Sequence, residues 1–475
     1  METLPDRISL DQCRQHVKEN VFRLRPADYG TKHPIWPGMV GIEVEMMPFV
    51  SSSLATNPKM IPLNGSTSLL SILKKLVSDS EGWIIRSNAD GSVASIGIGD
   101  DEQLTFEPGG QLEFSTRPFP CLTDATQRVS EIQGTLNRAF EKEGVVFLQN
   151  GTHPWASAEE IGLQMAKPRY QAMDRYFTQI GPYGRRMMRE TSTVQVNLDF
   201  GESEHTLANR YLASNLAASF LTAIFANSPV TSGKLNGFKT IRANIWRHLD
   251  AGRTGYPDLT KVLTRLDLDS CVDAYLDHVL SAHVVFVEAL DFKVTQTPVS
   301  FRQWIAHGID GTYPNLQDFK THLTLHFPEV RPKGFLELRS IDCQATAWQT
   351  VPASISAALL YDPKIVTRVI DTLGSKLDQL DSFWQRSVYG LDDPEMAKIC
   401  KSLLEMALEG FHRLPSCYQG KSTGKVLEVF AERFTFSGKS PADEVIQLVK
   451  KHPEKTLDSK EFLRLHEDWS QAARD

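Results

Sequence analysis

The sequence predicts an α+β fold, in which an antiparallel sheet with one face on the core is followed by a helical part. Two observations carry this prediction. Short segments between residues 40 and 341 alternate polar and apolar side chains, as antiparallel strands do when one face covers a core. Beyond Asp362 every segment instead has helical periodicity. Strands mixed with helices, then helices alone, favour an α+β body with a helical C-terminal part.

The predicted elements follow in chain order. A helix over residues 9–22 has Ser9 as its N-cap, because a serine hydroxyl can accept a hydrogen bond from a free amide of the first turn. Turn residues such as Pro108-Gly109-Gly110 separate short strands. The predicted strands are 40–47, 83–87, 93–98, 103–106, 111–115, 145–149, 191–200 and 335–341. The other predicted helices are 67–79, 122–143, 167–179, 205–226, 362–377, 394–412, 440–451 and 459–472.

Composition and charge narrow the class of protein. The 475 residues carry a formal net charge of -7, so there is no electrostatic reason to bind nucleic acid. No apolar run approaches the ~20 residues of a membrane span. The first residues lack the pattern of a signal peptide, and the six cysteines form no C-x-x-C pair. We therefore expect a cytoplasmic protein with reduced thiols that binds neither nucleic acid nor membranes.

The first candidate site is a pair of glutamates in the segment 41–46. Side chains alternate across a strand, so Glu43 and Glu45 share one face while the aliphatic residues beside them take the other. The two carboxylates then stand ~6.6 Å apart along the strand.

Three further segments show the same division of polar and apolar faces. The polar residues are Glu113 in 111–115, Gln195 and Asn197 in 193–199, and Glu337 and Arg339 in 335–339. A polar face in contact with water explains any one strand taken alone. As a set, however, Glu, Gln and Asn are poor strand formers, and clustered carboxylates repel unless a cation cancels the charge. Mg²⁺ takes oxygen ligands and often shares them with substrate phosphates, so the set indicates a magnesium site.

The sequence contains no intact nucleotide motif of the Gly-rich type. A P-loop needs G-x-x-x-x-G-K-[ST], and the G-K-S segments at 420–422 and 438–440 have Pro415 and Arg433 where the first glycine belongs. If ATP is used, it must be held by metal and by side chains of the sheet.

Other polar residues leave alternatives open. Arg242, Arg253 and Arg339 could bind carboxylates or phosphates, but each could equally be a surface or salt-bridged arginine. His322 and His326 have the i, i+4 spacing of some zinc ligands, but no Glu lies between them, which favours ordinary polar packing. Cys343 has no specified histidine partner and is predicted to be a buried thiol.

Eight short motifs together resemble one family, the plant-type glutamate–cysteine ligases and related bacterial enzymes, including those of ergothioneine biosynthesis. The motifs stand in the family's order and span residues 41–339. They are GIEVE (41–45), FEPGGQLEFS (106–115), PRYQAMDRYF (168–177), TVQVNLDF (193–200), FANSP (225–229), RANIW (242–246), RTG (253–255) and FPEVRPKGFLELR (327–339).

The resemblance implies a glutamine-synthetase-like fold, with a curved antiparallel sheet forming a funnel surrounded by helices. It implies a catalytic domain over 1–361 and a helical C-terminal region over 362–475 packed on it. It also implies the reaction: ATP with Mg²⁺ phosphorylates the γ-carboxylate of L-glutamate, and the amine of L-cysteine displaces phosphate to give γ-glutamylcysteine, ADP and phosphate.

The resemblance further implies roles for individual residues. The implied metal ligands are Glu43, Glu45, Glu107, Glu113 and Glu337. Gln195, Asn197 and Arg339 would bind ATP, with Arg339 facing the phosphates as a catalytic cation. Arg242 would be catalytic and would pair with a substrate carboxylate, and Trp246, Arg253 and Thr193 would line the substrate pocket.

Several alternatives to this function stay open at the level of sequence. A related ligase could use another acceptor amine or donor acid, and the pathway served, whether glutathione, ergothioneine or another, stays open. A phosphagen-type kinase shares the broader fold but would give no amide product, and a catalytically inactive binding protein would retain the motifs without turnover. We expect a monomer or weak homodimer that acts on small molecules.

Overall fold

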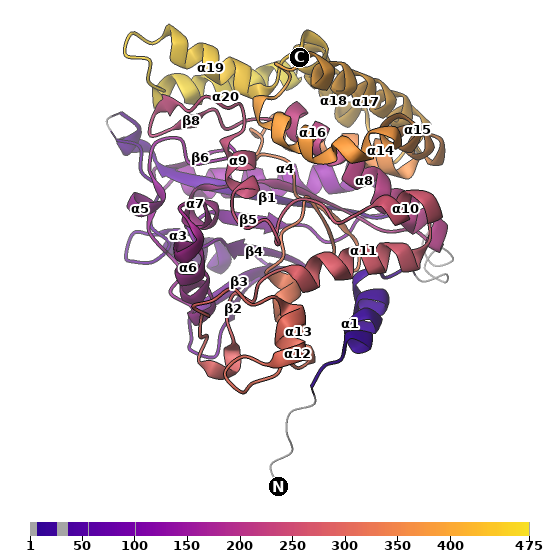
Figure 1. Cartoon of the computed structure of the whole chain (residues 1–475). Helices are drawn as coiled ribbons and strands as arrows, with labels where there is room; N and C mark the ends of the chain where they lie inside the picture. The colour runs from indigo at the N-terminus through magenta and orange to yellow at the C-terminus, as the bar shows by residue number, and fades with distance from the viewer. Residues whose placement is uncertain (1–6, 26–36, 56, 100, 475) are drawn as a thin grey trace.

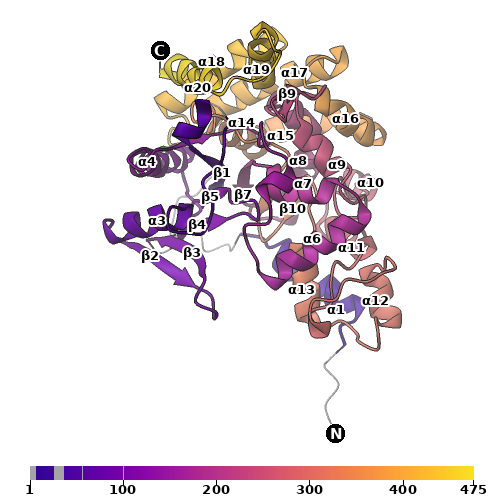
Figure 2. The same cartoon turned by 90° about the vertical axis from the view of Figure 1, so that its left-hand side faces the viewer.

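The computed structural model describes residues 7–25, 37–55, 57–99 and 101–474 of the chain. Figures 1 and 2 show one sheet in the middle of the molecule with helices around it, and the helices after residue 394 gather at the top of both views. No helix among the described residues combines the length and apolarity needed to cross a bilayer.

The main sheet has nine strands in the described part of the chain, and all its pairs are antiparallel. Eight strands run in the order β10-β11-β7-β1-β5-β4-β3-β2, and β6 pairs with the C-terminal end of β1. They are β1 (Val40–Val50), β2 (Trp83–Ser87), β3 (Val93–Ile98), β4 (Glu102–Phe106), β5 (Leu112–Ser115), β6 (Val145–Leu148), β7 (Val194–Leu198), β10 (Val330–Pro332) and β11 (Leu336–Leu338). A separate hairpin joins β8 (Val230–Thr231) to β9 (Lys234–Leu235).

Helices make up most of the rest. α1 (Leu10–His16) has Ser9 as N-cap and continues as a π-helical turn, η1 (Val17–Val21), which confirms the predicted helix. The helices as far as residue 224 are α3 (Leu69–Ser78), α4 (Leu122–Glu141), α5 (Ala158–Ile161), α6 (Pro168–Ile180), α7 (Tyr183–Glu190) and α8 (Glu204–Ile224). The next are α9 (Ile241–Arg247), α10 (Thr260–Arg265), α11 (Leu268–Ser281), α12 (Phe301–His307), α13 (Leu316–Thr324) and α14 (Val351–Tyr361). The last are α15 (Pro363–Leu373), α16 (Leu380–Arg386), α17 (Pro394–Arg413), α18 (Lys421–Arg433), α19 (Pro441–Lys451) and α20 (Ser459–Arg474).

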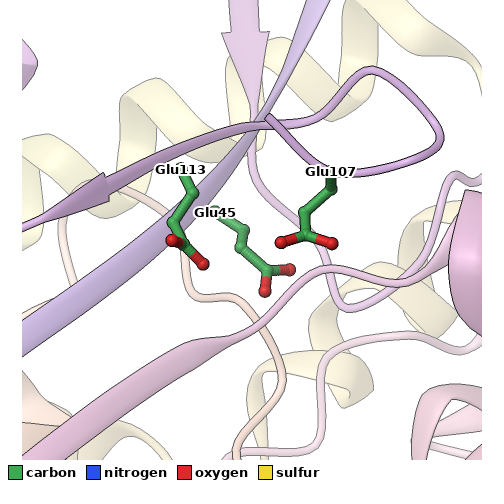
Figure 3. A group of neighbouring side chains, drawn as sticks. All are labelled: Glu45, Glu107 and Glu113. Atoms are coloured by element: carbon green, nitrogen blue, oxygen red, sulfur yellow. The ribbon is translucent and has the colours of Figure 1, made fainter. Parts of the chain in front are cut away.

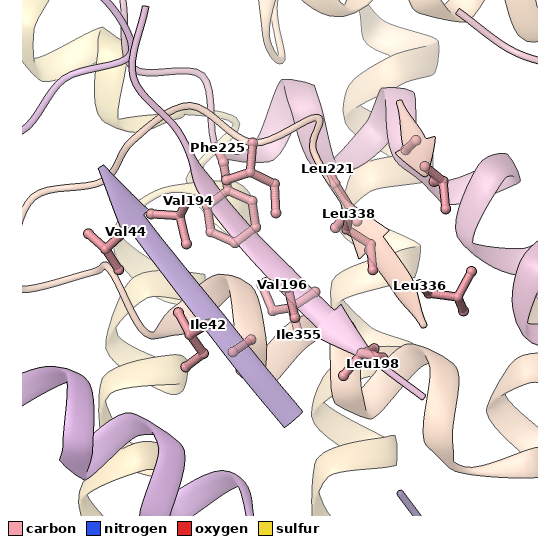
Figure 4. Close-up of a cluster of buried hydrophobic side chains, with 14 of the residues drawn as sticks. Ile42, Val44, Val194, Val196, Leu198, Leu221, Phe225, Leu336, Leu338 and Ile355 are labelled. Carbon is pink, nitrogen blue, oxygen red and sulfur yellow. The ribbon is translucent and has the colours of Figure 1, made fainter. Parts of the chain in front are cut away.

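One face of the sheet carries the hydrophobic core. Figure 4 shows the aliphatic side chains of β1, β7 and β11 pointing to the same side, where they meet Leu221 and Phe225 at the end of α8 and Ile355 of α14. Burying one such side chain stabilises a fold by about 1.5–3 kcal/mol. The sheet residues in this cluster are Ile42, Val44, Val194, Val196, Leu198, Leu336 and Leu338.

The other face of the sheet carries polar side chains, yet several of them have little solvent exposure. Strand register places Glu43 opposite Gln195, and Glu45 opposite Glu113. Glu45, Gln195 and Glu337 are only 7%, 4% and 0% exposed. A polar face open to water is therefore the wrong interpretation of these strands, because other parts of the chain cover them.

Two predicted strands are shorter than expected. β7 begins at Val194 because Thr191 and Thr193 form single bridges to separate partners, Thr152 and Asp342. Residues 335–341 keep strand geometry only over Leu336–Leu338. The elements that were not predicted are α5, α7, α9–α14 and β8–β10. Most of them are short and closely spaced between turn residues, although α11 has 14 residues.

Three smaller predictions can be compared with the structure. Cys343 is a fully buried free thiol, as predicted. His322 is buried and one ring nitrogen lies 2.9 Å from the carbonyl oxygen of Val279, which fits polar packing. The predicted division at residue 361 falls between α14 and α15, but residues from both sides share one hydrophobic cluster, so the two-domain division stays a prediction.

The turn between β4 and β5 depends on its glycines. The Glu107 amide donates to the Gln111 carbonyl at 3.0 Å, and Gly110 has φ +89. A Cβ on Gly109 would lie 2.3 Å from the carbonyl oxygen of Arg189, too close for any real contact. The turn therefore packs directly on the backbone at the end of α7.

We expect Gly109→Ala to lower the free energy of unfolding by about 1–3 kcal/mol, because the turn and the Arg189 backbone have to move apart. Urea unfolding measures this change. Gly134→Ala in α4 is the control: its new methyl group meets only the end of the Arg138 side chain at 3.3 Å, so helix propensity should stabilise it by up to ~1 kcal/mol. A Gly109→Ala protein as stable as the parent would contradict the packing described.

Candidate active site

The polar face of the sheet lines a cavity of about 260 Å³. β1, β5, β7 and β11 form its floor, and α6, α7, α9 and the segment 324–333 close it from above. All five glutamates predicted as metal ligands line this cavity, together with Thr193, Gln195, Trp246 and Arg339.

Three of these glutamates form a compact group. Glu45 comes from β1, Glu113 from β5, and Glu107 from the turn between β4 and β5 (Figure 3). One carboxylate oxygen of each lies within 4.8 Å of the other two. Strand register explains the pair Glu45 and Glu113, which are direct neighbours across β1 and β5.

Electrostatics make this group unstable without a cation. Burial, followed by repulsion from Glu107 and Glu113, raises the pKa of Glu45 well above its usual range. Burial likewise raises the pKa of Glu107 and of Glu113. Three carboxylate oxygens at this spacing are ligands that a hard divalent cation prefers, and such a cation would offset both the burial and the repulsion. The residues present therefore fit Mg²⁺.

Glu43 stands at the edge of the group. Burial, with repulsion from Glu113 and Glu337, raises the pKa of Glu43 to about 7. The Asn197 amide donates to its carboxylate at 2.8 Å. Glu43 also lines a second cavity of about 410 Å³, shared with Asn197, on the far side from Glu107. Glu43 thus separates the two spaces.

Glu337 is in a different electrostatic state. Its oxygens accept hydrogen bonds from Arg331 Nε at 2.6 Å and Arg339 Nη1 at 2.9 Å, and Lys333 Nζ lies 3.3 Å away. Burial alone would raise the pKa of Glu337, but these cations more than offset it and hold the pKa below its usual value. Protein cations already neutralise this carboxylate, so the structure does not place it in the compact group.

Two residues at the beginning of β7 bind the Glu45 carboxylate and orient it. The Thr193 amide donates to Glu45 Oε2 at 2.9 Å, and Gln195 Nε2 lies 3.5 Å from Oε1. Arg339 Nη1 donates to Gln195 Oε1 at 2.7 Å, which fixes the direction of the amide. Arg339 therefore links Glu337 to the three-carboxylate group through Gln195.

Arg242 and Trp246 lie together beside the main cavity. Both border a small space that also touches Phe327, Glu329 and Arg339. Among the described residues, Arg242 Nε and the Trp246 indole nitrogen are buried without a hydrogen-bond partner. A buried unpaired donor is costly, so two in one space favour an anionic or carbonyl ligand there.

Arg253 is placed elsewhere. It is fully buried, and its guanidinium donates to the Leu325 carbonyl at 2.5 Å, to the His283 carbonyl, and to Asp250 at 3.3 Å. It lines neither cavity. This placement fits a structural link between loops rather than the predicted contact with substrate.

Sequence reasoning assigned no role to several residues that line the cavity. Three are cations, Arg169, Arg331 and Lys333, which with Arg339 face the five glutamates. Three are methionines, Met173, Met187 and Met188, which form an apolar wall. Arg169 and Met173 lie in PRYQAMDRYF, and Arg331 and Lys333 in FPEVRPKGFLELR, so the motifs contained the signal but not the direction of each side chain.

Comparisons with known proteins agree with this geometry. A family model described as glutamate-cysteine ligase family 2 (GCS2) matches residues 39–458. The chloroplastic glutamate–cysteine ligase of Medicago truncatula is 32% identical over 375 residues, which cover 76% of this chain and 71% of that protein. The chloroplastic enzyme of Nicotiana tabacum is 31% identical over 365 residues, covering 74% and 67%.

A solved structure supports the fold. The crystal structure of a glutamate–cysteine ligase from Francisella tularensis in complex with AMP superposes with a TM-score of 0.52 at 13% identity, covering 92% of this chain and 89% of that one. At this identity the likeness shows the fold alone, and it confirms the predicted α+β class. The family model covers most of the chain, so the predicted class of enzyme, a ligase, is confirmed as well: the chain belongs to glutamate-cysteine ligase family 2.

Proposed function

We propose that the protein joins the γ-carboxylate of L-glutamate to the amine of L-cysteine, with ATP as co-substrate and γ-glutamyl phosphate as intermediate. One observation carries this proposal most directly: three mutually repelling glutamates, of which Glu45 is buried and the other two are half-buried, share a cavity with four cationic side chains. In a family of ligases, this arrangement suits the meeting of two anionic substrates.

The proposed reaction has two steps. A γ-carboxylate oxygen of glutamate attacks the γ-phosphorus of ATP, and ADP leaves. The cysteine amine then attacks the acyl carbon, loses a proton, and phosphate leaves. Mg²⁺ bound to Glu45, Glu107 and Glu113 would neutralise phosphate charge and stabilise the transferring group. Arg331, Lys333 and Arg339 face the same space and supply fixed positive charge without a protein nucleophile.

The nucleotide is proposed to enter from the second cavity. That cavity adjoins Glu43 and Asn197, and the Asn197 amide donates one hydrogen bond to Glu43, which stands beside the three-carboxylate group. A nucleoside placed there would direct its phosphates toward the cations of the main cavity. The relative crystallised with AMP supports a nucleotide site in this fold.

The unpaired donors of Arg242 and Trp246 are proposed to hold the α-carboxylate of glutamate. An arginine fork and an indole N–H suit a carboxylate, and both donors are buried without a partner among the described residues. Thr193 contributes a further buried hydroxyl, which has no hydrogen-bond partner in the described part of the chain.

The acceptor amine is the least constrained part of the proposal. Met173, Met187, Met188 and Phe327 give the cavity an apolar side, and methionine adapts to soft groups such as a thiol. This supports cysteine. The second candidate, a related ligase with another acceptor, uses the same carboxylates and cations with a different occupant of this wall.

A direct assay separates these candidates. We expect purified protein to release phosphate only when ATP, Mg²⁺, glutamate and cysteine are all present, because the amine must consume the acyl phosphate. A panel of other amines in place of cysteine serves as the comparison. Phosphate release that requires a different amine would favour the second candidate, and ATP consumption without an amide product would contradict ligation altogether.

Substitution of the carboxylate group should separate activity from stability. We expect Glu45→Gln and Glu107→Gln each to lower turnover by roughly 100-fold or more, a size typical of lost electrostatic stabilisation. Without Mg²⁺ both variants should melt no lower than the parent, since each removes one of three carboxylates that repel one another.

Glu102→Gln in β4 is the matched control. Glu102 is as buried as Glu45, and it pairs with Arg128 at 2.7 Å, outside the cavity. Its loss should lower the melting temperature and leave turnover unchanged. A Glu107→Gln variant that unfolds like the control would show that Glu107 stabilises the turn rather than binding metal.

Stability should also depend on pH through Glu43. Its pKa rises from 4.5 in the unfolded chain to about 7 in the fold, so the folded protein binds the proton more tightly. The resulting stabilisation is fully present below pH 4.5 and lost as pH rises through about 7. Without Mg²⁺ we expect unfolding free energy to fall by roughly 1–3 kcal/mol across that range. Thermal melts of Glu43→Gln should lack this part of the slope, and an identical slope would contradict the assignment.

A further inference from the structure

Asp342 is a buried carboxylate that lies outside both cavities and belongs to no predicted site. It is 1% exposed and follows β11, where it bridges to Thr193 at the start of β7. A Cβ on Gly151 would lie 2.5 Å from its carboxyl carbon, so a glycine is needed to make room for this side chain.

The Asp342 carboxylate accepts three hydrogen bonds from two segments. Oδ2 accepts from the Asn227 amide at 2.8 Å and from the Ser228 hydroxyl at 2.7 Å, just after α8. Oδ1 accepts from the Thr240 hydroxyl at 2.8 Å, at the N-cap of α9. Asp342 therefore joins the end of α8 to the beginning of α9.

The same hydroxyls hold the first turn of α9. Ser228 Oγ accepts from the Arg242 amide at 3.2 Å, and Thr240 Oγ1 accepts from the Ala243 amide at 3.1 Å. Because each hydroxyl donates its proton to Asp342, its lone pairs face the helix. Asp342 thus orients the two acceptors that fix the start of α9, and α9 carries Arg242 and Trp246.

Asp342 also lies close to the Arg242 guanidinium but forms no hydrogen bond with it. Nη1 lies 3.7 Å from Oδ1, beyond hydrogen-bond length, while Nη2 donates to the Arg339 carbonyl at 2.6 Å. Nε has no partner among the described residues. The Asp342 carboxylate supplies a nearby negative charge for the buried Arg242 guanidinium. Its hydrogen bonds go to two hydroxyls and a backbone amide instead, so part of the guanidinium stays available to a ligand.

We propose that Asp342 is a positioning residue, which holds the start of α9 so that Arg242 and Trp246 present unpaired donors to the carboxylate of the donor substrate. This role rests on the proposed function for the identity of that substrate. The placement of α9 itself does not depend on it.

The direction in which Asp342→Asn changes binding of the donor acid distinguishes a positioning role of Asp342 from a purely electrostatic one. Removing the negative charge of Asp342 would by itself make Arg242 more attractive to an anion and tighten binding of the donor acid. An amide at this place cannot accept from all three donors, because its NH₂ group must face at least one of them. Positioning therefore predicts weaker binding, opposite to the pure charge effect.

The test compares Asp342→Asn with Asp362→Asn. Asp362 is equally buried, accepts from the Lys364 and Ile365 amides and from Arg413, and caps α15 away from the cavities. We expect Asp342→Asn to raise KM for glutamate about tenfold, with KM for ATP within about twofold and kcat nearly unchanged. Asp362→Asn should lower the melting temperature and leave both KM values as in the parent.

Two milder substitutions at Thr240 keep the test usable if Asp342→Asn fails to fold. Thr240→Val removes the hydroxyl and should raise KM for glutamate in the same direction, whereas Thr240→Ser keeps it and should restore the parent value. Hydrogen–deuterium exchange of the segment 240–247 gives a readout without turnover. We expect about tenfold faster exchange there in Asp342→Asn, and no change there in Asp362→Asn.

The outcomes are separable. If the parent does not turn over glutamate, the proposed function fails, and the exchange measurement alone decides the role of Asp342. Unchanged exchange over 240–247 in Asp342→Asn, or an unchanged or lower KM for glutamate, would overturn the positioning role.

Discussion

The structure depends on the central strands of the sheet, β1, β7 and β11, which are covered on both faces, one apolar and one acidic. The apolar face packs on α8 and α14 and contributes to the main core. The acidic face holds Glu45 buried and Glu107 and Glu113 half-buried, and this loss of solvent disfavours the ionised form of each carboxylate. Burial on the apolar side has to offset the unfavourable electrostatics of the acidic side. Functional sites commonly depend in this way on the stability of the fold around them.

The charges of the cavity divide into two kinds. Glu337 is matched within the chain by Arg331, Lys333 and Arg339, which depress its pKa. Among the described residues the three-carboxylate group has no cation at ion-pair distance, which suits a countercharge supplied by a bound cation. The same logic applies to Arg242, whose nearest carboxylate, on Asp342, is occupied by other donors. A site that binds charged ligands needs groups that the protein itself leaves incompletely paired.

Much of this organisation could be predicted from local patterns. Alternation along 41–46 and 193–199 was enough to assign Glu43, Glu45, Gln195 and Asn197 to one face, because the period of a strand is fixed by its geometry. The cover over that face was not predictable, since helical periodicity in α6 does not reveal which distant strand the helix meets. The three-dimensional grouping of the glutamates likewise depends on pairing between strands far apart in sequence.

Arg253 shows the limit of motif reasoning. Its neighbours in the chain match the family, but its guanidinium is held by the carbonyls of His283 and Leu325, from segments that no local pattern links to it. Arginine in a motif can serve either a ligand or the backbone that surrounds the ligand. Only the acceptors around the fork distinguish these uses, and they belong to the tertiary structure.

The register of β1 has a consequence for how such a protein can change over generations. Its side chains serve the core and the acidic face at alternate positions, while its backbone pairs with β5, β6 and β7. Insertion of a single residue would turn Ile42 and Val44 toward the cavity and carry the glutamates into the core. Descendants of this gene can therefore exchange one side chain for another along β1, but the length of the segment has to be inherited unchanged.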